Sequence, residues 1–480
     1  MLTKSWFRNL PWPRWAELPA LQGARRRRSR QSATPTTSNA AGRSKSAQPF
    51  GLRRQAAVSG VAPPRRIAVD TPSSSLLGSS GMALATRLTR GFETSSKPQE
   101  SALVKSQKYR VTFGHIRVGK MARRLLDEAI KRDWVSEGPN VQQFEAGFAR
   151  EFGYAHAVAA SSGTDAGIVA MSVLAERGAR RGDEVITPAL AFVATANCIL
   201  AAGLTPKFVD VELETLNIDP ARIEEAITPR TRAIQVVHTM GKPCRMDEIL
   251  AIARKHRLAV IEDCCEAHGA TLNGKVVGSF GSMGLFSFYA AHIICSGEGG
   301  MISTNDPELA ALCRSVRSHG RRGGQLYFHF DRVGFNSKMN DLEAAIGLEG
   351  LAMFGETFSI RRQTLLQLQK LLSGLEDRLF LYRDGPGEIT CPHAFPLVLR
   401  NEKDSIQGFY DHLENTGIQC KTLFGSLPTQ HRAFAFLGYK QGVFPVAERI
   451  GGTGLHFGIH QYLTHEDIQY IADCITSYFK

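Results

Sequence analysis

The chain has 480 residues, enough for a globular enzyme with a full hydrophobic core. Its net charge of +13 points first to a nucleic-acid partner, yet residues 1–100 hold 17 basic and four acidic groups and carry that whole excess. The other 380 residues hold 41 basic and 41 acidic groups, so composition excludes a strongly basic globular body, and we expect no nucleic-acid partner.

Residues 1–105 form a segment rich in Ser, Pro, Arg and Ala. Such a segment cannot bury enough apolar surface to offset the entropy of ordering it, so we expect a disordered basic tail. The same acid-poor composition is typical of an organelle transit peptide, which is the alternative to a cytoplasmic enzyme with a solvated tail. Another alternative is an over-extended start, in which Met82 or a later codon begins the enzyme.

From residue 106 onward, short β-branched runs alternate with helical periods, a pattern typical of a mostly parallel sheet covered by helices. The runs that we interpret as strands are residues 183–188, 206–211, 233–238, 258–263, 284–289 and 299–304. Between them, residues 163–179 and 246–257 place apolar residues at helical spacing. We therefore predict an α/β domain over residues 106–355, with a helix near residues 341–354.

The pattern changes again near residue 356. Residues 393–400 are predicted to form a strand, and residues 403–415 and 464–479 amphipathic helices. We predict a smaller C-terminal α+β domain over residues 356–480. The longest apolar stretch of the chain, residues 189–204, is shorter than a membrane span requires.

The nine cysteines contain no CxxC pair, so we expect neither a zinc site nor a redox couple. They are scattered through segments predicted to be core and helix, where cysteine behaves as a small hydrophobic residue. The cysteines and the lack of a membrane span together favour a soluble protein of a reducing compartment, with no bound metal.

Polar groups follow several of the predicted strands, where α/β proteins bind ligands. Ser162, Gly163 and Thr164 stand at a strand-to-helix turn, where free backbone N–H groups and the helix dipole favour a phosphate. The alternative is a simple helix cap. Phe192 offers a flat surface on which an aromatic ring could stack, with a buried core side chain as the alternative.

Two further groups complete the pattern. Asp263 ends an otherwise apolar strand, where a carboxylate needs a cationic partner such as a protonated pyridine nitrogen. Ser287 and His292 precede a glycine-rich turn at residues 297–300. A phosphate turn, a stacking ring, a buried aspartate and a reactive side chain together indicate a pyridoxal 5'-phosphate (PLP) site.

With these motifs the chain resembles the DegT/DnrJ/EryC1/StrS family, the PLP-dependent aminotransferases and dehydratases that act on nucleotide-linked keto sugars. The resemblance covers roughly residues 108–478. The motifs that carry it are EGPNVQQFEAGFAREFG (137–153), SSGTDA (161–166), TPALAFVATAN (187–197), MDEILAIARKH (246–256), VIEDCCEAHGA (260–270), GKVVGSFGSMGLFSFY (274–289), GEGGMISTND (297–306) and GFNSKMNDLEAAIGL (334–348). It implies the PLP-dependent transferase fold type I, with a mostly parallel seven-stranded sheet in the large domain.

The resemblance also implies roles for individual residues. Asp263 would hold the pyridinium nitrogen, with His268 as a neighbour of that carboxylate. The residues at phosphate positions are Gly163, Thr164 and Ser287, and Phe192 is at the ring-stacking position. Asn336 matches an asparagine that reaches the phosphate from the neighbouring subunit, which implies a homodimer with shared sites.

Two positions depart from the aminotransferase pattern. After Ser-Phe-Tyr and two further residues stands His292, where the aminotransferases have the lysine that forms a Schiff base with PLP. This substitution is similar to the family's sugar 3-dehydratases, in which pyridoxamine 5'-phosphate (PMP) joins a 4-keto sugar and histidine takes a proton as the C3 hydroxyl leaves. Glu266 stands where the aminotransferases have glutamine, as in one branch of the dehydratases.

One dehydratase branch holds an iron–sulfur cluster with cysteines that follow the motif matched here by residues 315–321. The segment after that motif, residues 322–335, has no cysteine, so we expect no cluster and a PMP form regenerated from glutamate. Two alternatives stay open: transamination through another lysine such as Lys338, and a cofactor-binding regulator without catalysis. The loops at residues 319–330 and 422–434 are expected to determine the sugar nucleotide.

Overall fold

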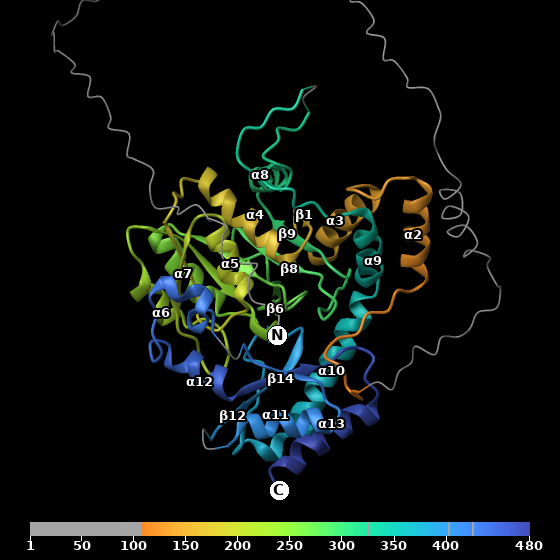
Figure 1. Cartoon of the computed structure of the whole chain (residues 1–480), viewed down its shortest axis with the longest axis vertical. Coiled ribbons are helices and arrows are strands. Elements are labelled where there is room, and N and C mark those ends of the chain that lie inside the picture. The colour runs from red at the N-terminus through yellow and green to blue at the C-terminus, as the bar shows by residue number, and fades with distance from the viewer. Residues whose placement is uncertain (1–107, 325–326, 402–403, 425–426) are drawn as a thin grey trace, which may run out of the picture. The chain divides into compact units, whose positions relative to one another are not determined.

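The computed structural model describes residues 108–324, 327–401, 404–424 and 427–480 (Figure 1). The predictions for residues 1–105 lie outside these ranges. No helix within them is long and apolar enough to cross a membrane.

A seven-stranded sheet forms the centre of the first part of the chain. Its strands are β1 (His156–Ala160), β2 (Glu184–Pro188), β3 (Thr205–Val209), β4 (Thr231–Val237), β5 (Ala259–Asp263), β8 (Met283–Ser287) and β9 (Gly300–Thr304), in the spatial order β1-β9-β8-β5-β4-β2-β3. The pairs from β3 to β8 are parallel, and β9 is antiparallel to both β8 and β1. The predicted mostly parallel, seven-stranded sheet is therefore confirmed.

Helices cover both faces of this sheet (Figure 1). They are α2 (Lys120–Lys131), α3 (Pro139–Phe152), α4 (Gly163–Glu176), α5 (Val193–Ala201), α6 (Pro220–Ala226), α7 (Met246–His256), α8 (Pro307–Arg317), α9 (Asp341–Ala352) and the 3-10 turn η1 (Thr239–Gly241). Ala157 and Ala159 of β1 pack in the cluster that holds Phe148 of α3, whereas Val158 packs with α4 and α8 on the other face. A strand buried on both faces has no polar alternation, which explains its uniformly apolar sequence.

A second, antiparallel sheet follows in the C-terminal part, in the order β10-β12-β14-β13. Its strands are β10 (Leu379–Phe380), β12 (Ala394–Leu399), β13 (Cys420–Thr422) and β14 (Gly454–Gly458). The helices of this part are α10 (Phe354–Leu371), η2 (Ser373–Leu375), α11 (Ile406–Asn415), η3 (Pro428–Gln430), η4 (Arg432–Leu437), α12 (Pro445–Thr453) and α13 (His465–Tyr478). The predicted strand and the two predicted amphipathic helices of this region correspond to β12, α11 and α13.

The two parts of the chain are joined by shared elements. The strand β11 (Glu388–Ile389) pairs with β6 (Thr271–Leu272), which pairs with β7 (Lys275–Val276). Helix α10 also runs across the predicted boundary at residue 355. The described residues belong to one compact unit, so the division into domains at residues 106–355 and 356–480 stays a prediction.

A buried carboxylate fixes the start of α3. Asp341, the first residue of α9, is fully buried and accepts hydrogen bonds from the backbone N–H groups of Asn140 (2.8 Å) and Val141 (3.1 Å). Its other oxygen pairs with Arg132 at 2.9 Å.

Replacing Asp341 with alanine leaves the buried N–H groups of Asn140 and Val141 without an acceptor, so we expect the free energy of unfolding to fall by about 2–4 kcal/mol. Urea denaturation measures this loss, and Asp127→Ala, which breaks an exposed pair with Lys131, should leave the midpoint unchanged.

Candidate active site

A cavity of about 1000 Å³ opens at the carboxyl edge of the parallel strands. Eight of the ten predicted site residues line it, namely Ser162, Gly163, Thr164, Phe192, Asp263, Glu266, Ser287 and His292. They come from the turn before α4, the start of α5, the segment after β5 and the end of β8 with the loop that follows it. Because the parallel strands all end at this edge, residues more than 100 positions apart meet around one space.

The turn before α4 combines a cap with an anion-binding geometry. Ser162 is the N-cap residue, and its hydroxyl accepts a hydrogen bond from the Asp165 N–H at 3.0 Å, so the helix-cap alternative holds for this side chain. Gly163 and Thr164 begin the helix, where N–H groups have no intrahelical acceptor. A Cβ atom at Gly163 would lie 2.6 Å from Cβ of Ser287, so only glycine lets the two segments meet. This cradle, which a side chain would fill, fits a phosphate group.

Asp263 faces the cavity from the end of β5. Its Oδ2 accepts a hydrogen bond from the hydroxyl of Thr195 at 3.1 Å, and its Oδ1 accepts one from the N–H of Cys265 at 3.2 Å. No lysine, arginine or histidine within the described ranges forms an ion pair with this carboxylate. A half-buried carboxylate held by neutral donors has the chemistry required to bind a protonated pyridine nitrogen.

Phe192 lies at the cavity wall with 63% of its surface exposed. The alternative of a buried core phenylalanine is therefore wrong. It caps the N-terminus of α5 with an extended backbone, which directs this large apolar ring out of the protein core. An exposed ring beside Asp263 is free to stack on a flat ligand.

His292 lies in the loop between β8 and β9 and is half-buried against the cavity. Its Nδ1 atom is buried without a hydrogen-bond partner in the part of the chain that the structure describes. Burial, followed by the nearby Arg361 guanidinium, lowers the pKa of His292 to about 3. The imidazole is therefore neutral near pH 7 and able to accept a proton.

Glu266 lies on the same cavity and is held by the backbone. Its Oε2 accepts a hydrogen bond from the Met240 N–H at 2.7 Å. Burial raises the pKa of Glu266 to about 7, the Met240 hydrogen bond opposes this shift, and the charge of Asp263 adds to it. This carboxyl can consequently change its protonation state near neutral pH.

The remaining two predicted site residues do not line the cavity. His268 is fully buried, and its ring lies 5.6 Å from Phe286, 5.8 Å from Phe288 and 6.2 Å from His292, measured between centroids. No hydrogen bond to Asp263 is formed among the described residues. Asn336 accepts a hydrogen bond from Lys338, and neither residue lines the cavity of its own chain. A role for Asn336 in a neighbouring subunit stays a prediction.

A second part of the cavity lining comes from the C-terminal part of the chain, and the loop at residues 422–434, which was expected to determine the sugar nucleotide, contributes Thr422, Phe424 and His431 to it. This part of the lining also includes Tyr410, Lys421 and the histidines His393 and His456. Among the described residues that line the cavity, Lys421 is the only lysine. Its Nζ atom lies 4.2 Å from the ring centroid of Phe113. No local motif identifies these four residues, because Tyr410 stands alone in α11 and the other three stand alone beside or within strands of the C-terminal sheet.

One buried group has the composition of a metal site. Ligand atoms of His238, Glu262 and Cys264 lie within 4.8 Å of one another. However, Nδ1 of His238 accepts a hydrogen bond from the Cys244 N–H at 3.0 Å, and Nε2 lies 3.2 Å from Glu262. Both ring nitrogens are thus used by the protein, and this group is explained as a hydrogen-bond network behind β5.

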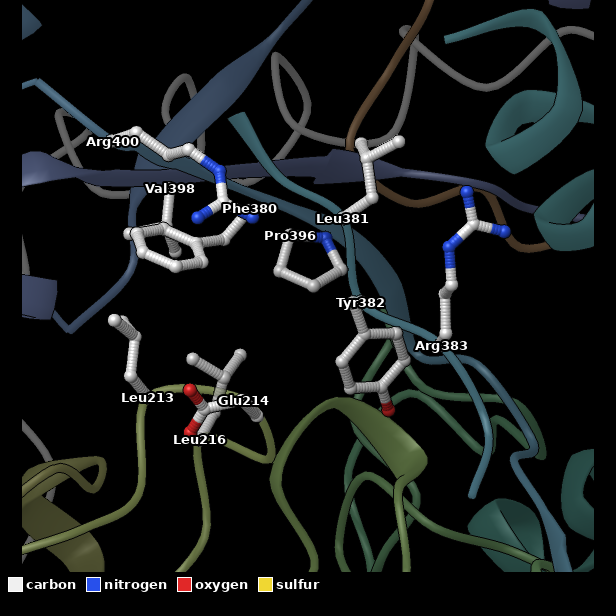
Figure 2. Close-up of a pocket in the computed structure, with 10 residues that line it drawn as sticks. All are labelled: Leu213, Glu214, Leu216, Phe380, Leu381, Tyr382, Arg383, Pro396, Val398 and Arg400. Atoms are coloured by element: carbon white, nitrogen blue, oxygen red, sulfur yellow. The ribbon is translucent and has the colours of Figure 1, made fainter. Parts of the chain in front are cut away.

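A second, smaller cavity of about 320 Å³ lies between residues 213–216 and the strands β10 and β12 (Figure 2). In Figure 2 the guanidinium of Arg400 lies over the ring of Phe380, 3.9 Å from its centroid. None of the predicted site residues lines this cavity.

Comparison with known proteins agrees with this geometry. The DegT/DnrJ/EryC1/StrS aminotransferase family matches residues 117–476. A dTDP-4-dehydro-2,6-dideoxy-D-glucose 3-dehydratase of Saccharopolyspora spinosa is 34% identical over 381 residues, covering 72% of this chain and 81% of the relative. A GDP-perosamine synthase of Caulobacter vibrioides is 37% identical over 350 residues, covering 71% of this chain and 91% of the relative.

Solved structures extend the comparison to the fold and the cofactor. The structure of a GDP-4-keto-6-deoxymannose-3-dehydratase with a trapped PLP–glutamate geminal diamine has a TM-score of 0.71 and 27% identity. The match covers 76% of this chain and 100% of that structure. The PLP-dependent transferase fold predicted from the sequence is thereby confirmed.

Proposed function

Because this chain belongs to the DegT/DnrJ/EryC1/StrS family of PLP-dependent sugar aminotransferases and dehydratases, we propose that it removes the C3 hydroxyl of a nucleotide-linked 4-keto-6-deoxy sugar. His292 would be the base, and glutamate would supply the amino group that makes PMP. The sugar nucleotide is inferred from the substrates in the relatives' names, and glutamate from the adduct trapped in the similar dehydratase.

The observation that carries this proposal is the neutral imidazole of His292 on the cavity wall. The aminotransferase pattern requires a primary amine at this position, where histidine can exchange protons but cannot form a Schiff base with PLP. Lys338, the alternative lysine, does not line the cavity of its own chain.

The residues around the cavity fit the cofactor in three places. The N–H groups at the start of α4, together with the Ser287 hydroxyl, would hold the phosphate. Asp263 would hold a proton on the pyridine nitrogen, and Phe192 would stack on the ring. When bound, PLP or PMP supplies an electron sink for the charge that remains after proton removal.

His292 can serve both halves of a dehydration. As a neutral base it accepts one proton at a ring nitrogen, and as an imidazolium it gives that proton to the departing C3 hydroxyl, which leaves as water. The sugar then has one hydroxyl fewer, and His292 returns to its neutral state. Loss of the C3 oxygen is a two-electron reduction of the sugar, which would be balanced by the oxidation of glutamate to 2-oxoglutarate with release of ammonia.

Glu266 predicts a basic limit to activity. Its raised pKa of about 7 means that the carboxyl is protonated, and able to donate a hydrogen bond, below this pH and ionised above it. The neutral form and its contribution to stability are fully present below the ordinary glutamate pKa and are lost as the pH rises through about 7. We expect kcat/KM to fall above pH 7 in the wild type and to stay flat between pH 6 and 8 in Glu266→Gln. A pH–rate profile measures both, and an unchanged basic limb in the variant would contradict this role.

The reaction is tested by incubating the protein with a dTDP- or GDP-linked 4-keto-6-deoxy sugar, PLP and 15N-labelled glutamate. Proton and carbon NMR should show a product that lacks the C3 oxygen, with ammonia released and no 15N on the sugar. A sugar carrying 15N at C4 would establish transamination instead. Cofactor binding without turnover of any keto sugar would favour the regulator.

Transamination is the second candidate, because the GDP-perosamine synthase is the more identical of the two relatives and Lys421 lines the cavity. Its Nζ atom lies over the ring of Phe113, so the lysine would have to leave that ring to reach a cofactor. Labelled product separates the two candidates.

We also propose a homodimer with shared sites. Asn336 does not line its own chain's cavity, and the neighbouring loop exposes Tyr327, Phe328 and Phe330 by 74%, 67% and 57%. Exposed aromatic residues of this kind are enriched in interfaces. Sedimentation velocity tests the dimer, and Asn336→Ala should weaken PLP binding without changing the sedimentation coefficient.

A further inference from the structure

A second imidazole lies beside His292. His393 precedes β12 in the C-terminal part, yet its ring centroid is 4.9 Å from that of His292, with an angle of 44° between the ring planes. Both residues line the cavity. Two histidines about 100 positions apart in the sequence therefore share one edge of the site.

Each of the two rings has a buried nitrogen without a hydrogen-bond partner among the described residues. In both rings this nitrogen is Nδ1. A buried polar atom without a partner is costly, and such atoms in native proteins usually have a function or a bound water. No hydrogen bond joins the rings as they lie here, so pairing needs a small ring rotation or one bridging water.

One arginine fixes the backbones of both histidines. Arg361 of α10 is 3% exposed and donates from Nη1 to the carbonyl oxygen of His393 at 3.0 Å and from Nη2 to that of His292 at 3.4 Å. No carboxylate pairs with it within the described ranges. Burial, with a further contribution from this cation, lowers the pKa values of both histidines, so both rings are neutral near pH 7.

We propose that His393 is a positioning residue for His292: it accepts a hydrogen bond from Nδ1–H of His292, directly or through one water. A neutral imidazole carries one proton, and its hydrogen-bond partner determines which nitrogen holds it. With Nδ1 protonated toward His393, the lone pair of His292 is on Nε2 and available to the cavity. The catalytic meaning of this pair rests on the proposed function, whereas the pair itself does not.

The pair can be tested in the protein without cofactor or substrate. Diethylpyrocarbonate modifies unprotonated ring nitrogens, and peptide mass spectrometry measures the rate at His292. At pH 7 we expect His393→Phe to slow this modification by about three- to tenfold, because the proton then resides mainly on Nε2, whose lone pair is no longer free. His393→Gln keeps an acceptor oxygen and should restore most of the rate. His460→Gln, which replaces a buried imidazole outside the cavity lining, is the matched control.

The tautomer of His292 in the wild-type protein gives a second measurement, which does not depend on a folded His393 variant. In 15N NMR of histidine-labelled protein, the His292 signals, assigned by their loss in His292→Asn, should show a protonated Nδ1 and an unprotonated Nε2. The reverse tautomer would overturn the proposal. So would an unchanged or higher rate in His393→Phe, or an equal loss in His393→Gln or His460→Gln. A correct tautomer in a protein that does not dehydrate keto sugars would disprove the proposed reaction alone.

Discussion

Replacing His292 with asparagine is expected to slow conversion of the keto sugar by about 10²- to 10⁴-fold, the contribution of a well-placed acid–base group. Asparagine fills a similar space but cannot accept the proton. The backbone carbonyl of His292 keeps its hydrogen bond from Arg361, and the side-chain amide of asparagine can still donate a hydrogen bond. Affinity for PLP should therefore change by less than about threefold.

Steady-state kinetics and absorbance titration with PLP measure the two effects separately. His460→Asn is the matched control, because this buried histidine does not line the cavity. Its rate should stay close to that of the wild type. A His292→Asn enzyme that retains more than a tenth of the wild-type rate would show that another group removes the proton.

Replacing Asp263 with asparagine is expected to lower PLP affinity by about 10- to 100-fold, because a charge-assisted hydrogen bond becomes a neutral one. The turnover rate should also fall, since a neutral amide does not stabilise a proton on the pyridine nitrogen. The substitution preserves shape, and its oxygen can still accept from Cys265 or Thr195. The fold should therefore be retained.

Thr195→Val separates the charge of Asp263 from its orientation. It removes the 3.1 Å hydrogen bond to Oδ2 and leaves the carboxylate in place. We expect PLP affinity to fall by about two- to tenfold, the effect of one neutral hydrogen bond. Equal losses in Thr195→Val and Asp263→Asn, or no loss in either, would contradict the assignment of Asp263 to the pyridine nitrogen.

The first wall of the site could be predicted because a parallel sheet gathers strand ends. Each of β5 and β8 is an apolar run that ends at a polar residue, Asp263 or Ser287, so sequence order already places both side chains at one edge. The turn before α4 was predicted for the same reason. In contrast, β1 was missed, since its HAVAA sequence is short and rich in alanine, which has a low preference for strands.

The lining that comes from the C-terminal part was predicted only for the loop at residues 422–434. His393 and Lys421 lie beside or within strands of a different, antiparallel sheet, and their place at this cavity depends on how α10 and the C-terminal sheet pack. Local periodicity has no information on that packing. The exposure of Phe192 could not be predicted either, because an apolar ring in an apolar stretch has the same sequence pattern whether it faces the core or a cavity.

We propose that an imidazole, and no lysine, is the reactive side chain beside the cofactor. Loading the purified protein with PLP, treating it with borohydride and mapping the peptides by mass spectrometry tests this assignment. We predict no peptide with PLP attached to lysine, and conversion of the bound cofactor to PMP when glutamate is added before the borohydride. A stoichiometric PLP adduct on Lys421 or any other lysine would contradict the account.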